Sequence, residues 1–295
     1  MNKHLILDGS NLLHRNYWVS KIRKNQVPVG LLFLNSIKKL SVQYPGRKCL
    51  CVWDSRQIRG VKNFRQLSKT EYKQNRDKEK NADVFSHEAH VVDMSTKLGV
   101  YHLNPGKLEA DDFIHWLTKQ SDDSVVVSSD SDLLQLVSNK CSVYNPIKDI
   151  MYTEENFYET TKCGNVNWLI ELKCIVGDKS DNIPGLVGYG IKRATKLLES
   201  NFEGLTHEQK KQLKMNRELI DLKYGLIKHP EELEVYEQTY ERVLSKDAKD
   251  LDSFFKQCKR HKYNSILNKQ SEWRSLFDST HNISNLATNL IRLLK

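Results

Sequence analysis

Residues 124–132 read Ser-Val-Val-Val-Ser-Ser-Asp-Ser-Asp, an apolar run that ends on two carboxylates. Its three consecutive β-branched residues, Val125 to Val127, favour a strand that is buried on both faces of a parallel sheet. Ligands of open α/β sheets bind beyond the carboxyl ends of the strands. The stretch therefore predicts an α/β fold and places Asp130 and Asp132 at a ligand site.

Two other short apolar runs, 5–7 and 48–53, also end on an aspartate, Asp8 and Asp54. We expect a mostly parallel central sheet flanked by helices, with a turn at 9–11 that exposes the Asp8 carboxylate. A strand-like segment is also expected at 100–103. The expected helices are 29–44, 85–98, 109–118, 167–176, 189–199, 206–223 and much of 245–295.

The composition is that of a folded soluble protein, with 39% hydrophobic and 28% charged residues among 295. No apolar run approaches the ~18 residues of a membrane helix, and the apolar stretch near the N-terminus is too short for a signal peptide. The six cysteines show no zinc-ligand spacing and are expected to be reduced. We expect a cytoplasmic protein of one large domain or two smaller ones.

The net charge of +9 is concentrated between Arg56 and Lys80, where nine Lys or Arg face three acids. Basic positions recur there every three or four residues, so a helix would carry them as one stripe. Tyr72 beside Lys73 and Arg76 is typical of single-stranded nucleic-acid binding, with a ring for bases and cations for phosphates. A solvated helix face is the alternative, and for the basic run 256–263 both interpretations stay open.

The acids are grouped within this basic chain as Glu109-Ala-Asp111-Asp112, Asp130-Ser-Asp132 and Asp178-Lys-Ser-Asp181. Helix capping explains one or two of them. Crowded carboxylates without a cation would stay partly protonated, whereas Mg²⁺ and Mn²⁺ prefer such oxygen ligands. The candidate metal ligands are Asp8, Asp54, Glu109, Asp111, Asp112, Asp130, Asp132, Asp178 and Asp181.

A glycine-rich turn, 185–190, precedes a helix whose first turn carries Lys192 and Arg193. Gly188 and Gly190 would let the backbone approach a phosphate, and the helix N-terminus offers free N–H donors. For the acidic segment just before it, 177–184, a plain helix-ending turn is the alternative. Together with the neighbouring acid pair, the pattern predicts a DNA-backbone clamp.

These motifs, in this order, resemble the 5′ to 3′ exonuclease and flap endonuclease superfamily, most closely the stand-alone bacteriophage 5′ nucleases and the 5′ nuclease domain of bacterial DNA polymerases. The resemblance spans about residues 4 to 200 and then fades. It rests on Leu7-Asp8-Gly9-Ser10-Asn11, Val52-Trp53-Asp54, Phe64-Arg65, Tyr72-Lys73-Gln74-Asn75-Arg76, the three acidic groups, and Asn182-Ile-Pro184-Gly185.

The resemblance implies a PIN-like nuclease core at 1–165 that includes a helical arch at about 56–85. It implies a helical DNA-binding part at 166–295 that begins with a helix-three-turn-helix at about 169–198. One metal site would draw on Asp8, Asp54, Glu109, Asp111 and Asp112, and a second on Asp130, Asp132, Asp178 and Asp181, some through water. DNA contacts would come from Arg65, Tyr72, Lys73, Arg76, Gly188, Gly190, Lys192, Arg193 and Lys196.

The implied activity is Mg²⁺- or Mn²⁺-dependent hydrolysis of DNA phosphodiesters with two or more ions per site, in replication or repair. Lys73, Arg76, Asp8 and Asp130 would be catalytic, and a K⁺ ion could sit at the helix-three-turn-helix. The expected substrates are branched, nicked or flapped DNA. The alternatives are RNase H-like removal of RNA from RNA–DNA hybrids, a PIN-like ribonuclease, or a catalytically silent structure-specific DNA-binding protein.

The arch motif and the glycine clamp argue against the plain PIN-like ribonuclease, and the complete acid set argues against a silent protein. A single-strand-binding protein or a sliding clamp are candidate partners, and a monomer without membrane contact is expected. For a phage protein the compartment would be the host cytoplasm.

Overall fold

The computed structural model describes residues 2–22, 27–54, 65, 72, 78–104, 106, 108–246 and 248–278. A six-stranded sheet of order β3-β2-β1-β4-β5-β6 forms its centre. Strands β1 (Lys3–Asp8), β2 (Lys48–Val52), β3 (Tyr101–Leu103), β4 (Asp123–Val127) and β5 (Cys141–Asn145) run parallel to their neighbours. Strand β6 (Ile150–Tyr152) closes one edge antiparallel to β5. The mostly parallel α/β sheet predicted from the sequence is confirmed.

Alternate residues of the central strands pack into two different hydrophobic cores, one on each face of the sheet. Leu5, Leu7 and Val125 pack with α1 (Gly9–Ile22), α2 (Val29–Gln43) and α5 (Glu88–Thr96). Ile6 and Val126 point to the other face, where they pack with α6 (Ala110–Lys119). Because both faces are covered, β1 and β4 have unbroken apolar centres, Leu5 to Leu7 and Val125 to Val127, as the valine run indicated.

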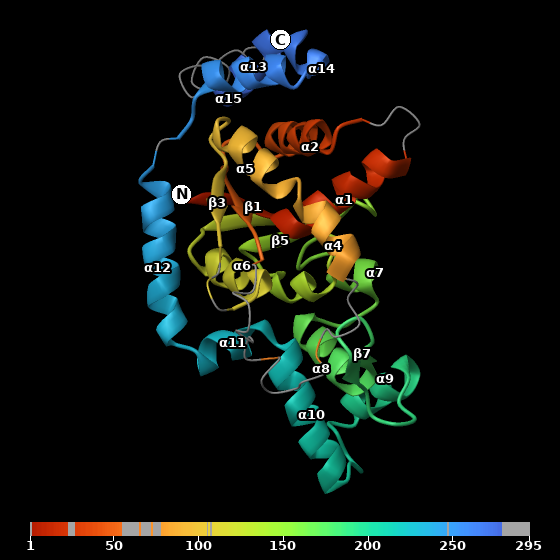
Figure 1. Cartoon of the computed structure of the whole chain (residues 1–295). Helices are drawn as coiled ribbons and strands as arrows, with labels where there is room; N and C mark the ends of the chain where they lie inside the picture. The colour runs from red at the N-terminus through yellow and green to blue at the C-terminus, as the bar shows by residue number, and fades with distance from the viewer. Residues whose placement is uncertain are drawn as a thin grey trace, which may run out of the picture.

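A helical lobe lies beyond the carboxyl ends of the strands, at the bottom of Figure 1. The chain enters it from β6 through α7 (Phe157–Thr161), and the short helix η1 (Asp132–Leu136), which follows β4, packs against it. The lobe contains α8 (Val166–Val176), the short pair β7 (Gly177–Asp178) and β8 (Ile183–Pro184), α9 (Ile191–Glu199) and α10 (His207–Ile220). Ile175, Leu186 and Leu197 belong to its own small core.

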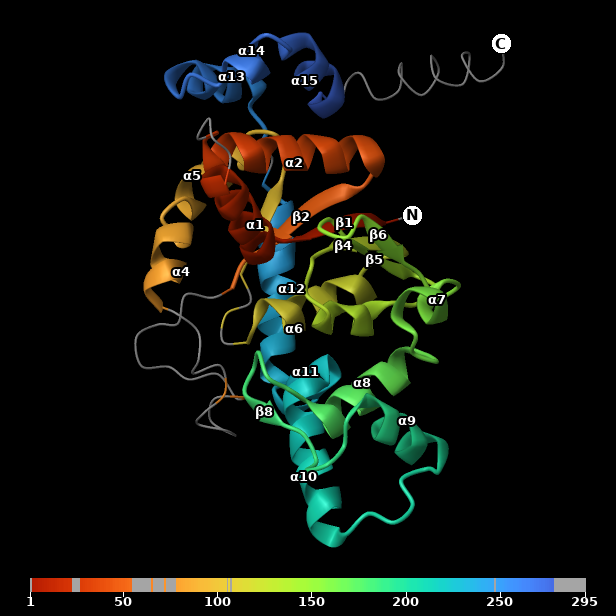
Figure 2. The ribbon, with the colours of Figure 1, turned by 90° about the vertical axis from the view of Figure 1, so that its right-hand side faces the viewer.

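The chain then returns along the sheet to its opposite end. Helix α11 (Leu222–Lys228) leads into α12 (Glu231–Leu244), which runs along one side of the core in Figures 1 and 2. The Tyr236 ring of α12 lies 4.2 Å from that of Phe113. Helices α13 (Leu251–Arg260), α14 (Asn264–Leu267) and α15 (Gln270–Phe277) share a third core with Leu34 and Met94.

Several sequence-based boundaries were wrong. Helix α1 begins at Gly9, so residues 9–11 are helical, and Asp8 is buried instead of exposed. The helix expected at 85–98 is α5, which is shorter at both ends, and a separate helix, α4 (Lys78–Phe85), precedes it. Strands β5 and β6 and helix α12 were not predicted. Among the described helices, none is long and apolar enough to cross a membrane.

Candidate active site

Three carboxylates converge where β1, β2 and β4 end. Asp8 is only 6% exposed; its Oδ1 accepts from the Asn11 backbone N–H at 3.0 Å and its Oδ2 from the Ser128 hydroxyl at 2.8 Å. Burial, with smaller contributions from the negative charges of Asp54 and Asp130, raises the pKa of Asp8 to about 7 despite these hydrogen bonds. A cation in this position would favour the ionised carboxylate.

Hydrogen bonds hold the segments that follow the strands in place. Asp54 Oδ1 accepts from the backbone N–H of Ala110, the first residue of α6, at 3.3 Å. Asp130 Oδ1 accepts from the Asp132 N–H at 2.9 Å, and Asn11 Oδ1 accepts from the Ser129 N–H at 3.1 Å. The loop after β2 is therefore fixed to the start of α6, and the start of α1 is fixed to the loop after β4.

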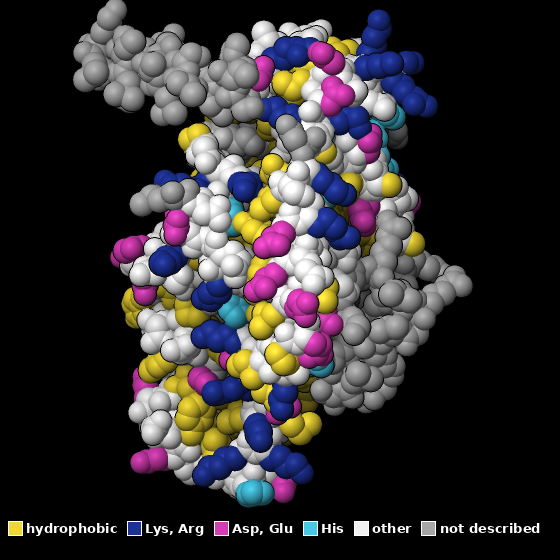
Figure 3. Space-filling view, turned by 90° about the vertical axis from the view of Figure 1, so that its left-hand side faces the viewer, with side chains coloured by type: hydrophobic (Ala, Val, Ile, Leu, Met, Phe, Trp, Pro, Cys, Tyr) yellow, Lys and Arg dark blue, Asp and Glu magenta, His cyan; other side chains and the backbone are white. Residues whose placement is uncertain are grey.

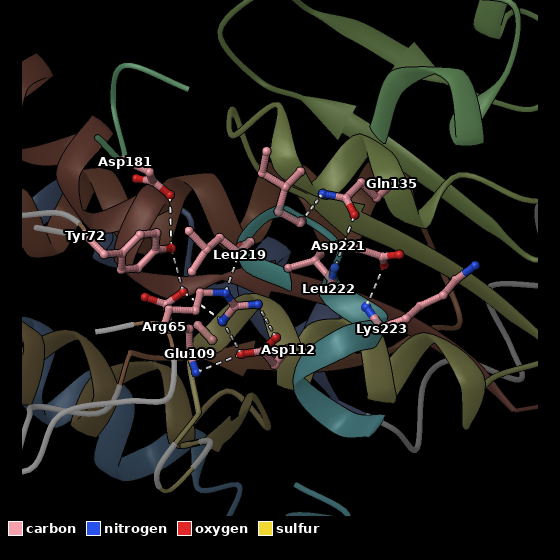
Figure 4. A network of polar contacts seen from close by, with 12 residues as sticks. Arg65, Tyr72, Glu109, Asp112, Gln135, Asp181, Leu219, Asp221, Leu222 and Lys223 are labelled. Carbon is pink, nitrogen blue, oxygen red and sulfur yellow. Dashed lines mark hydrogen bonds and ion pairs between the residues drawn. The ribbon is translucent and has the colours of Figure 1, made fainter. Parts of the chain in front are cut away.

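The first turn of α6 presents acids that are held by an arginine. Glu109 caps the helix, and Asp112 accepts from the Glu109 N–H at 3.1 Å in a capping box. The Arg65 guanidinium contacts Asp112 at 2.7 and 2.8 Å and Glu109 at 3.0 Å. The Tyr72 hydroxyl lies 3.1 Å from both Glu109 and Asp181 (Figure 4).

A lysine joins the remaining pair of acids. Lys173 Nζ, on α8, contacts Asp132 directly and lies 3.4 Å from Asp178 Oδ2. Burial acts to raise the pKa of Asp178, but the Ser180 hydroxyl and Lys173 outweigh it and lower the pKa below its usual value. The ionised form of Asp178 is thus stabilised by the protein itself.

These contacts connect eight of the predicted metal ligands, and the ninth, Asp111, lies next to Asp112 in the first turn of α6. Within the described ranges, however, no three or more His, Cys, Asp or Glu side chains are arranged to hold a metal ion as they stand. Arg65 and Lys173 lie among the acids instead. The donors are carboxylate oxygens, which suits a hard divalent ion. The acids therefore fit Mg²⁺ or Mn²⁺ by their chemistry, and the division into two sites stays a prediction.

The predicted DNA-binding residues fall into three groups. Gly188, Gly190, Lys192, Arg193 and Lys196 are all exposed around the start of α9. Arg65 and Tyr72 are buried, so a direct contact with DNA would require them to leave their acidic partners. Lys73 and Arg76, with most of the predicted arch, lie outside the described residues.

The surface of the lobe around α9 and α10 is basic. Arg193 stacks on the Tyr189 ring, 4.3 Å from its centre, beside the Gly188–Gly190 turn. Lys210, Lys211 and Lys214 are exposed on α10, and Figure 3 shows Lys and Arg side chains gathered at that end of the molecule. The charge is placed to meet a polyanion.

Sequence reasoning did not identify four polar residues of the site: Lys173, Ser128, Asn11 and Gln135. Lys173 could have been noticed as a lone cation in the apolar segment Trp168–Val176, five residues before Asp178. Ser128 and Asn11 lie inside the motifs that were singled out. Gln135, which bonds the α10–α11 connection, has no sequence signal.

Comparisons with known proteins agree with this geometry. The model of the N-terminal resolvase-like domain of 5′-3′ exonucleases matches residues 3–162. The 5′-3′ exonuclease of Bacillus subtilis strain 168 is 32% identical over 212 residues, covering 67% of this chain and 70% of the relative. That of Aquifex aeolicus strain VF5 is 28% identical over 298 residues, covering 92% and 98%.

The fold also recurs among solved structures. The 5′-exonuclease of bacteriophage T5 with zinc ions bound superposes with a TM-score of 0.66 at 23% identity, covering 83% of this chain and 99% of that one. At this identity the likeness shows the fold alone. The family model, in contrast, covers more than half of the 295 residues. The chain therefore belongs to the 5′-3′ exonuclease family and is a nuclease of that family.

Proposed function

We propose that this protein is a structure-specific 5′ nuclease that hydrolyses DNA phosphodiesters with divalent metal ions. The single observation that supports this best is the convergence of Asp8, Asp54 and Asp130 in a molecule whose helical lobe also carries a basic, glycine-led helix. Strand-end carboxylates serve hard cations, and the exposed start of α9 serves a phosphate backbone. The molecule thus combines the means to hold metal and DNA.

The metal ligands would come from the nine acids named above, with Asp8 and Asp130 nearest the reaction. Mg²⁺, for which Mn²⁺ can substitute, would supply an activated water and charge stabilisation when bound. The chain's own residues orient the acids: Ser128 and Asn11 fix Asp8, and Lys173 holds Asp132 and Asp178. Lys73 and Arg76 would stabilise the negative charge of the transition state.

DNA would be held by its backbone and not by its sequence. Gly188 and Gly190 would allow a phosphate to approach the N-terminus of α9, with Lys192, Arg193 and Lys196 alongside, and a K⁺ ion would fit at the same turn. Tyr72 would stack on a base only after leaving Asp181. A T5 flap endonuclease relative has been solved with DNA and metal ions, which supports flapped or nicked DNA as the substrate.

We place the protein in the cytoplasm as a monomer, in replication or repair, with a single-strand-binding protein or a sliding clamp as partner candidates. We divide it into a nuclease core at 1–165 and a helical part at 166–295. Helices α12 to α15 of the second part pack against elements of the first, including β3 and α2. The two parts are therefore proposed as one cooperative structure.

One assay tests the proposal. The protein is incubated with labelled 5′-flap, nicked-duplex and RNA-primed substrates, with Mg²⁺ or with EDTA. Cleavage of flap and nicked DNA is expected only with Mg²⁺, and Asp8→Asn should abolish it while binding persists. Binding without Mg²⁺-dependent cleavage would support the silent DNA-binding alternative. Preference for the RNA-primed substrate would support primer removal, and equal rates on unstructured RNA would contradict flap recognition.

A further inference from the structure

The connection between α10 and α11, residues 219–222, is held by two side chains that come from the acidic site (Figure 4). Arg65 Nε donates to the Leu219 carbonyl at 3.0 Å. Gln135 Nε2 donates to the Ile220 carbonyl at 2.9 Å, and its Oε1 accepts from the Leu222 N–H at 3.3 Å. These bonds occupy free backbone groups at the end of one helix and the start of the next.

Arg65 ties this connection to α6. Its side chain is 1% exposed, and its remaining donors reach Asp112 in a two-pronged contact and Glu109 in a third bond. Asp112 is fully buried, and both of its oxygens are taken, since Oδ2 also accepts from the Glu109 N–H. An arginine in this geometry fixes its carboxylate partner in orientation as well as in charge.

Gln135 ties the same connection to the other acids. It lies on η1, which begins at Asp132, the acid that Lys173 holds. Gln135 is itself buried. A displacement of residues 219–222 would therefore strain the Arg65 bonds to α6 and the Gln135 bonds to η1.

Helix α10 extends from this connection to the DNA clamp. Asn216 Nδ2 donates to the Cys174 and Pro184 carbonyls, both at 2.8 Å. Gln212 Nε2 donates to the Pro184 and Gly185 carbonyls at 3.2 and 3.1 Å. The glycine-rich turn, α10, residues 219–222 and the acidic site thus form one continuous hydrogen-bonded path.

We propose that Arg65 and Gln135 are positioning residues that lock the DNA clamp to the acidic site. In this arrangement Asp112 anchors Arg65 instead of ligating a metal ion, which leaves eight of the nine acids named above as metal ligands. This inference rests on the proposed nuclease function. It gives the buried Arg65 a role that needs no contact with DNA. Because small misplacements of reacting groups slow catalysis strongly, loosening the path should reduce turnover more than binding.

The first experiment measures hydrogen exchange in the full-length, metal-free protein. Arg65→Gln and Gln135→Met should both accelerate amide exchange at residues 219–222, and Arg65→Gln also at 109–112. Arg47→Gln is the matched control, because it removes an ion pair with Asp123 at the opposite end of β4. Unchanged exchange at 219–222 in both variants would overturn the proposal, and this readout does not depend on nuclease activity.

The second experiment compares turnover with binding. Arg65→Gln should lower kcat by about 10- to 100-fold, while its Kd for metal-free nicked duplex stays within about twofold of the wild type. Arg65→Lys, which keeps the charge without the two-pronged contact, should show a smaller loss and covers the case in which Arg65→Gln does not fold. Equal losses in kcat and in binding would make Arg65 a DNA contact and contradict its positioning role.

A double-variant cycle tests the part assigned to Asp112. If Asp112 only anchors Arg65, Arg65→Gln combined with Asp112→Asn should be no slower than the slower single variant, because both changes remove one interaction. If the double variant's reduction in kcat equals the product of the two single reductions, Asp112 acts independently of Arg65, as a metal ligand would. A wild-type protein that cuts no DNA would refute the proposed function but leave the exchange result valid.

Discussion

At the scale of single residues, Asp8 combines function with an energetic cost. Its carboxylate is buried among Asp54 and Asp130, and its pKa of about 7 lies far above the ordinary 3.8. In metal-free protein at pH 8 the folded state must therefore hold a charge that the unfolded state holds easily. Such strain is typical of functional sites, where stability is given up for activity.

Asp8→Asn should consequently stabilise the metal-free protein at pH 8, by up to about 4 kcal/mol on the linkage between pKa and stability. The amide oxygen can keep the bond from the Asn11 N–H, and the amide N–H can donate to the Ser128 hydroxyl oxygen in place of the bond that Ser128 donates to Asp8. The gain should vanish by pH 4, where the wild-type carboxyl is protonated. Urea unfolding in EDTA measures it, with Asp93→Asn, an exposed helical carboxylate, as control. A variant that is no more stable at pH 8 would contradict this account.

Residue types were predictable at this scale, but their partners were not. Acids two or three positions apart are visible in the sequence, and α/β topology explains why Asp8, Asp54 and Asp130 meet. Arg65 was expected to touch DNA because the family resemblance implied such a contact. Its pairing with Asp112 spans 47 residues and depends on where the chain brings α6, which local charge patterns do not encode.

At the scale of elements, burial explains what the sequence could show. Strands β1 and β4 were predictable because both of their faces are covered, which leaves an unbroken apolar run. Strand β6 forms one edge of the sheet and β5 lies next to it. Both were missed, because β5 mixes polar and apolar residues and β6 has only three residues. Helix α1 was missed because Gly9, Ser10 and Asn11 favour turns locally, whereas packing of Leu12 and Leu13 in the core determines the outcome.

The start of α9 offers a matched pair of glycines. Gly188 has φ +80°, a backbone conformation that is strained for residues with a side chain. Gly190 has an extended backbone instead, and a methyl group added there would meet no other atom within 4 Å. Gly188→Ala should destabilise the fold by about 1 kcal/mol. Gly190→Ala should leave the thermal midpoint nearly unchanged but weaken nicked-duplex binding, because its methyl group would obstruct a phosphate. Unaltered affinity in a folded Gly190→Ala would argue against this clamp.

At the scale of the whole molecule, the return of α12 along the core could not be predicted. Its glutamate-rich first turn favours a helix, but nothing in a local pattern tells which partner Tyr236 will meet. The resulting contact with Phe113 ties the C-terminal helices to the element that carries Asp111 and Asp112. Stability of the acidic site should therefore depend on residues far from it in sequence.

Buried histidines make the stability of the molecule depend on pH. His102 Nδ1 accepts from the Trp53 indole N–H at 2.8 Å, and Nε2 lies 2.9 Å from the Ser95 hydroxyl. Burial lowers the pKa of His102 to about 3, and burial likewise lowers the pKa of His4 and His115 to about 4. These rings are neutral in the folded state but bind protons near pH 6.5 once unfolded.

The unfolded state thus binds more protons below pH 6.5, so stability is complete above that pH and falls as the pH decreases toward the folded values. His102 alone should remove about 2 kcal/mol between pH 7 and pH 5. Asp8, with its raised pKa, acts in the opposite direction over this range but is outnumbered by the three histidines. His102→Gln, whose amide oxygen can still accept from Trp53, should therefore lose about 2 kcal/mol less stability than the wild type between pH 7 and pH 5. Urea unfolding at both pH values in EDTA tests this prediction. If variant and wild type lose the same unfolding free energy between pH 7 and pH 5, His102 is not the titrating group.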